Sequence, residues 1–180
     1  MSEKTTIRGS GKDFVPCPAG LHRAVGVDVL DPWTEDVPAQ FLKPGGPKTR
    51  TRTKLVWETD EKMADTGEPM LVSEFYTWSL HEKAKLRKHL EAWRGRKFTE
   101  DERQVFDVEK IIGVPCQLHI THRTTEGGTF ANVEAVVPMS KGQEPLKPSG
   151  KYIRMQDRDP APEATPDPGQ FVATDDDIPF

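Results

Sequence analysis

The C-terminal end of the chain carries the residue types best suited to recognition chemistry. An acidic run precedes an apolar pair, and the final ring carries its own α-carboxylate. A pocket that holds a ring beside a terminal carboxylate, bordered by Arg or Lys, would bind such an end. We expect partner binding by this segment, the tip, which consists of Asp175, Asp176, Asp177, Ile178, Pro179 and Phe180. The alternative is a solvated acidic tail.

The tip closely resembles the end of bacterial single-stranded DNA-binding proteins, in which an acidic run leads into Ile-Pro-Phe. The run from Trp78 to Thr99 also resembles small replication-associated proteins of bacteriophages and prophages. These resemblances imply a protein that coats single-stranded DNA and uses its tip to recruit a helicase, primase, exonuclease or clamp-loader subunit. The Asn- and Gly-rich opening strand of the bacterial protein is missing here, so its tetramer and its wrapping of DNA are not carried over.

Charge is distributed unevenly along the 180 residues. The net charge is −4, but residues 157–180 hold seven acidic residues and one Arg, so the rest of the chain is net +2. A mildly basic body suits a polyanionic ligand. Because the excess is small, two other functions stay open. One is an adaptor or decoy that occupies tip-binding pockets of host enzymes without binding DNA, and the other is a strand-annealing recombination factor.

Catalytic and metal-binding motifs are missing from the sequence. It has no Gly-rich phosphate loop, Gly-x-Ser-x-Gly elbow or His-Glu-x-x-His, so we expect neither an enzyme nor a cofactor. Cys17 and Cys116 are the only cysteines, which we expect to be reduced thiols. We expect no zinc site from these cysteines with His22, His119 or His122, because no Cys-x-x-Cys pair is present and the last two histidines face opposite sides of a predicted strand.

Apolar residues are concentrated between residues 20 and 140. We expect a flexible arm at 1–18, one domain at 19–142, a disordered Pro-rich acidic linker at 143–174, and then the tip. No stretch approaches the roughly 20 apolar residues that span a bilayer. The start of the chain lacks the apolar stretch of a secretory signal, so we expect a cytoplasmic protein, in a bacterial host if phage-encoded. We expect a monomer or a low-order homo-oligomer.

The predicted elements favour an all-β domain. Alternating apolar residues predict five strands, at residues 20–30, 49–58, 71–80, 114–123 and 130–137. Capping boxes at Ser79–Glu82 and Thr99–Glu102 predict helices that run to about Trp93 and Ile112. This is the element order of an OB-fold, a five-stranded Greek-key barrel with its helix between strands three and four. An α+β roll is the alternative, but a long, Gly-interrupted first strand favours the barrel.

Cations that follow phosphates, and rings on which bases stack, bind single strands. Arg50, Arg52 and Lys54 alternate along the second predicted strand, which belongs to the binding face of OB-folds. We therefore expect these three side chains to contact DNA.

The third predicted strand supplies the rings. Tyr76 and Trp78 share one face with Glu74, and the charged neighbour suggests that this face points outward. We therefore expect both rings to stack bases. The alternative is that both are core residues and Phe75 is the exposed ring, since periodicity defines which residues share a face better than which face is buried.

Three further cations, Arg94, Arg96 and Lys97, precede Phe98 at a helix-to-loop junction. They either clamp a nucleic-acid backbone or form a solvated turn whose Phe98 packs against the next helix. The sequence leaves both interpretations open.

Overall fold

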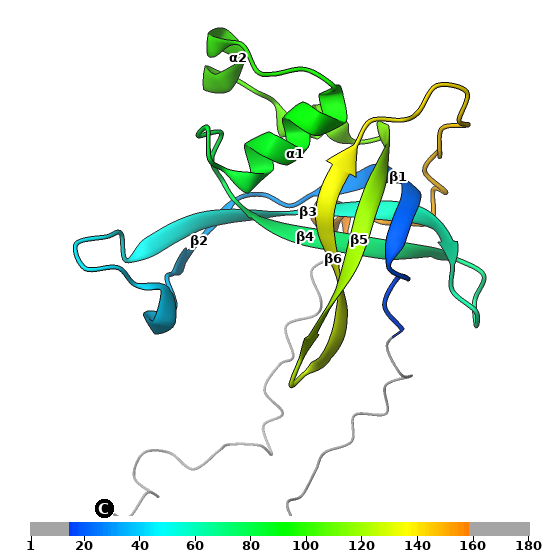
Figure 1. Ribbon diagram of the computed structural model, residues 1–180, viewed down its shortest axis with the longest axis horizontal. Helices are drawn as coiled ribbons and strands as arrows, with labels where there is room; N and C mark the ends of the chain where they lie inside the picture. The colour runs from blue at the N-terminus through cyan, green and yellow to red at the C-terminus, as the bar shows by residue number, and fades with distance from the viewer. Residues whose placement is uncertain (1–14, 159–180) are drawn as a thin grey trace, which may run out of the picture.

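The computed structural model describes residues 15–158, which form one antiparallel sheet and two α-helices (Figure 1). The strands are β1 Gly20–Val29, β2 Trp33–Asp36, β3 Thr49–Lys62, β4 Pro69–Thr77, β5 Pro115–Thr125 and β6 Gly128–Val137, and the helices are α1 Lys85–Arg94 and α2 Glu100–Gln104. Within this range, no helix has the length and apolar character needed to cross a bilayer. The tip lies outside the described residues.

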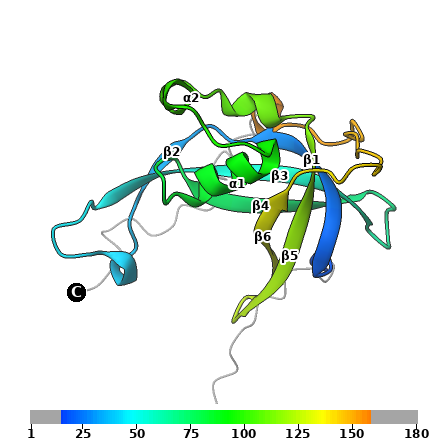
Figure 2. The ribbon, with the colours of Figure 1, turned by 45° about the horizontal axis from the view of Figure 1, so that its top comes forward.

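The long strand β3 organises the sheet. It pairs with β1 and β2 along one edge and with β4 along the other, while β1 also pairs with β5, and β5 with β6. Strands β3 and β4 cross the group formed by β1, β5 and β6, and α1 lies over one end of the sheet (Figures 1 and 2). The described residues show no ladder between β4 and β6, but Val133 N–H donates to Glu74 Oε2 at 3.2 Å. The predicted order of long strands and helix is confirmed; closure into a barrel is not shown.

Helix α1 packs on the core through the predicted stripe of Leu86, Leu90 and Trp93, all of which are buried. The ring of Trp93 lies 5.9 Å from that of Trp57 on β3. Gly95 adopts φ 71° and ends the helix, as predicted, because glycine enters this region without a steric cost.

Gly26 allows a second close approach, between β1 and the 3₁₀ turn Val108–Ile111. A Cβ atom at Gly26 would lie 2.7 Å from the Ile111 carbonyl oxygen and 2.8 Å from the Trp93 ring. The glycine that interrupts the first predicted strand is therefore required by packing against the turn and α1.

Helix boundaries differ from the prediction. Helix α1 begins at Lys85 rather than near Ser79, because Ser79 Oγ accepts from the His81 N–H within a turn. The second capping box forms in full, with Thr99 Oγ1 accepting from Glu102 N–H and Glu102 Oε2 accepting from Thr99 N–H. Helix α2 nevertheless ends at Gln104, well before Ile112.

Two segments predicted as irregular are ordered. Strand β2, within an expected loop, pairs with the first residues of β3. At the end of the expected arm, Cys17 is buried and its carbonyl accepts a hydrogen bond from His122 Nε2 at 2.8 Å. The domain therefore begins before residue 19.

Residues 142–158, the strap, also belong to the domain, so the prediction of a disordered linker from residue 143 is wrong for this part. Leu146 and Tyr152 pack against Val25, Val27 and Val56 on the outer face of β1 and β3. The strap covers an apolar patch that would otherwise face water.

Two buried carboxylates on neighbouring strands hold the strap. Asp28, which is 1% exposed, accepts from the Tyr152 hydroxyl at 2.9 Å and from Met155 N–H at 2.8 Å. Glu58 accepts from both the N–H and the hydroxyl of Ser149 at 2.8 Å. Composition could not reveal this docking, because each contact joins residues about 90 or more positions apart. A buried carboxylate without donors is costly, which ties the strap to folding.

We predict that a chain ending at Lys141 is strongly destabilised. Without the strap, Asp28 and Glu58 lose donors at buried sites, and breaking one buried charged contact costs about 3–5 kcal/mol. Urea unfolding measures the loss. The matched control is a chain ending at Arg158, which keeps the strap and should unfold like the full chain. Equal stability of both truncated chains would contradict the docking.

Candidate nucleic-acid interface

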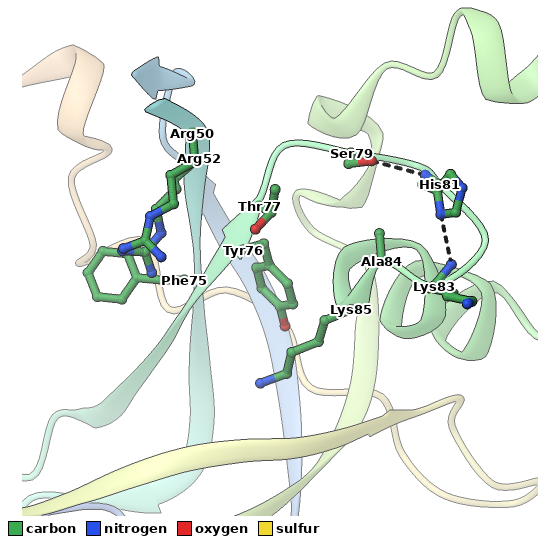
Figure 3. A pocket seen from close by; sticks show the side chains of 10 residues that line it. All are labelled: Arg50, Arg52, Phe75, Tyr76, Thr77, Ser79, His81, Lys83, Ala84 and Lys85. Atoms are coloured by element: carbon green, nitrogen blue, oxygen red, sulfur yellow. Dashed lines mark hydrogen bonds between the residues drawn. The ribbon is translucent and has the colours of Figure 1, made fainter. Parts of the chain in front are cut away.

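A groove of about 400 Å³ lies where β3 and β4 meet the segment that leads into α1 (Figure 3). It is lined by Arg50, Arg52, Phe75, Tyr76, Thr77, Ser79, His81, Lys83, Ala84 and Lys85. The lining includes four Arg or Lys side chains and no carboxylate. Glu35 pairs with both arginines and Glu74 pairs with Lys85, so the four cations exceed the two carboxylates that neighbour them, and a net positive groove attracts polyanions.

Glu35 on β2 orients the two arginines of the groove. Its Oε1 accepts from Arg50 Nε at 2.8 Å and from Arg52 Nη1 at 3.0 Å, while Trp33 Nε1–H donates to Oε2 at 3.1 Å. The hydrogen bonds from Trp33, Arg52 and Arg50 lower the pKa of Glu35 to about 2. Because one carboxylate serves two guanidinium groups, the cluster keeps a net positive charge.

Phe75 is the ring that the groove exposes. It is 45% exposed, and Arg52 Cζ and Lys54 Nζ lie 4.8 Å and 5.1 Å from its centroid. Trp33 packs against it edge-on at 6.1 Å. Figure 3 shows the Arg52 side chain beside this ring. Trp78, 40% exposed, follows the end of β4 and does not line the groove.

Tyr76 is not a stacking residue, so that prediction is wrong. Its side chain is 1% exposed, and its hydroxyl lies 2.7 Å from His89 Nδ1. Burial raises the pKa of Tyr76 well above its usual value. The prediction relied on Glu74 as a marker of the solvent face, but Glu74 pairs with Lys85 Nζ at 3.1 Å and accepts from Val133 N–H. A carboxylate with such partners can lie on the inner face.

The cations near Phe98 have structural partners. Arg94 Nη2 lies 2.7 Å from Glu102 Oε1, and its guanidinium lies 4.5 Å from the centroid of the Phe98 ring. Arg96 pairs with the same carboxylate at 3.0 Å. Phe98 is buried, which favours the packed turn over a backbone clamp. Lys97 is exposed and lies outside the groove.

The sequence reasoning missed His81, Lys83 and Lys85. It placed the segment after Ser79 in a helix, whereas α1 begins only at Lys85, and the turn before it places His81 and Lys83 in the lining of the groove (Figure 3). His81 Nδ1 accepts from Lys83 N–H at 3.3 Å. The only sequence signal was a pair of lysines shortly after the aromatic strand.

Comparison with protein-family models and with curated proteins gives no match to this chain. The function below therefore follows from the geometry of the groove and the residues of the tip.

We predict a pH dependence of stability from His89, below the groove. Burial and the nearby Lys85 lower the pKa of His89 to about 4. In the unfolded chain, histidine takes up a proton near pH 6.5. The contribution of neutral His89 is therefore complete above about pH 6.5 and is lost as the pH falls towards 4. Urea unfolding of the wild type and of His89→Gln across this range measures it. Parallel pH profiles in the two chains would contradict the prediction.

Proposed function

We propose that this protein binds single-stranded DNA through the groove and recruits partner proteins through its tip. The observation that carries the first part is an exposed ring, Phe75, that contacts the cations Arg52 and Lys54 in a groove that Arg50 also lines. Single strands offer both unpaired base faces and phosphates, which is the combination that rings and cations bind. A duplex hides its base faces, so the same groove would bind it mainly through phosphates.

The proposed fold is an OB-type barrel. A closed five-stranded barrel has five neighbouring strand pairs, and the sheet has four of them, namely β1–β3, β3–β4, β1–β5 and β5–β6. The contact between Glu74 and Val133 joins the remaining two edges. In OB-folds the second and third strands form the binding face, and these correspond to β3 and β4, where the groove lies.

The tip supplies the second part of the proposal. Its resemblance to bacterial single-stranded DNA-binding proteins favours replication and repair enzymes as partners. A decoy that only occupied the pockets of such enzymes would have no use for a basic groove with an exposed ring. The groove therefore favours DNA coating over the decoy.

We expect binding to a labelled oligo-dT to weaken steeply as salt rises, because bound phosphates release counterions. A duplex of equal length should bind more weakly. Fluorescence anisotropy at several salt concentrations measures both effects. If the protein does not bind the single strand at low salt, the groove is not a DNA-binding site and the decoy function is favoured.

Phe75→Ala should weaken single-strand binding by about 1–3 kcal/mol, the usual contribution of one stacked base. Stability should change little, because the ring is half-exposed. Phe41→Ala is the control, since Phe41 is also exposed, at 62%, and lines neither this groove nor the pocket that Phe75 shares with β6. A similar loss in both variants would show that binding is not centred on the groove.

Removing residues 175–180 should abolish binding to partner enzymes. The affinity for single-stranded DNA should stay equal or rise, most clearly at low salt, because three carboxylates no longer compete with DNA for the basic body. Phe180→Ala alone should cause most of the loss of partner binding, because the Phe180 ring is the only large apolar anchor of the tip. Phe171→Ala is the matched control. Pull-down with purified replication enzymes measures this binding. If the truncated chain retains the partner enzymes, the tip is not their binding segment.

A further inference from the structure

Three side chains with metal-ligating atoms meet at the end of β3 opposite the groove. His22 lies near the start of β1, and Asp60 and Glu61 lie near the end of β3. His22 Nδ1 is 3.7 Å from Asp60 Oδ1 and 3.4 Å from Glu61 Oε1. Ligand atoms at about 2.0 Å from a tetrahedral Zn²⁺ ion lie roughly 3.3 Å apart. The spacing therefore suits one small divalent ion.

The hydrogen bonding of His22 leaves Nδ1 available as a ligand. Its Nε2 lies 2.7 Å from the Pro18 carbonyl oxygen, which can only accept, so Nε2 carries the proton. A neutral imidazole with a proton on Nε2 has its lone pair on Nδ1. A backbone carbonyl bound to the second nitrogen is the usual support of a metal-ligating histidine.

Asp60 adds a carboxylate oxygen without a donor. Arg23 Nε donates to Asp60 Oδ2 at 3.1 Å, whereas Oδ1 is buried and has no hydrogen-bond partner within residues 15–158. Buried polar atoms normally have a partner. Three acceptors, one nitrogen and two carboxylate oxygens, therefore face one another, and a cation would satisfy all of them.

A local irregularity brings both carboxylates to His22. Adjacent residues of a regular strand point to opposite faces, but the β3–β4 pairing shifts its register between Glu58 and Lys62. Asp60 and Glu61 lie within this shift. The Glu61 side chain is 42% exposed, so an ion can enter from solvent and keep a water ligand.

We propose that His22, Asp60 and Glu61 bind one Zn²⁺ ion. One imidazole and two carboxylates suit zinc better than Mg²⁺, which prefers an all-oxygen octahedral shell. Two ligands are carboxylates from β3, so this site differs from the Cys and His set considered from the sequence. The ion joins the start of β1 to the end of β3, away from Arg50 and Arg52, and stabilises the fold without contacting DNA.

Isothermal titration of the full chain with Zn²⁺ should show one ion per chain at this site, and the thermal unfolding midpoint should rise with Zn²⁺ concentration. Mg²⁺ at the same concentrations should do neither. Absence of a Zn²⁺-dependent rise in the midpoint would overturn the proposal.

Variants locate the ion. Glu61→Gln and Asp60→Asn should each weaken Zn²⁺ binding by at least about tenfold, since even loss of a supporting residue costs about 10–100-fold. His119→Ala, which removes an exposed histidine of β5, is the matched control. In NMR spectra, Zn²⁺ should shift the imidazole signals of His22. The site is refuted if the imidazole signals of His22 do not respond to Zn²⁺ and all the variants bind Zn²⁺ with the affinity of the wild type.

Discussion

The Glu74 carboxylate joins three elements on which the groove depends. From β4 it accepts the Val133 N–H of β6 and pairs with Lys85 at the start of α1. This inward carboxylate sets the orientation of β4, because neighbouring side chains on a strand alternate. Tyr76 therefore lies in the core and Phe75 in the groove. In the sequence, the charge of Glu74 wrongly suggested that its face of β4 is exposed, because the partners that allow it to lie inward, Val133 and Lys85, come from other segments.

Compensated carboxylates recur across the domain and explain why a body of small net charge presents a basic groove. Asp28 pairs with Arg154 of the strap, and Glu102 pairs with Arg94 and Arg96. Glu35 serves two arginines but neutralises only one charge. Net charge counts all these acids equally, whereas the local field depends on which cations they leave free.

The proposed activities occupy separate parts of the chain. The groove lies at the start of β3, the proposed zinc site at its end, and the strap covers the outer face between β1 and β3. The tip follows the strap in the sequence and lies outside the described residues. This separation means that a variant at one site can be tested without disturbing the others.

Periodicity by itself determined the long strands, the buried stripe of α1 and the helix stop at Gly95, because these depend on neighbours a few positions apart. It also placed Arg50, Arg52 and Lys54 on one strand. Only the tertiary structure decided that Phe75 rather than Tyr76 is exposed, that the strap is ordered, and that His22 meets Asp60 and Glu61. Each of these outcomes depends on partners far apart in sequence, and a local pattern carries no information about which distant donor will satisfy a given carboxylate.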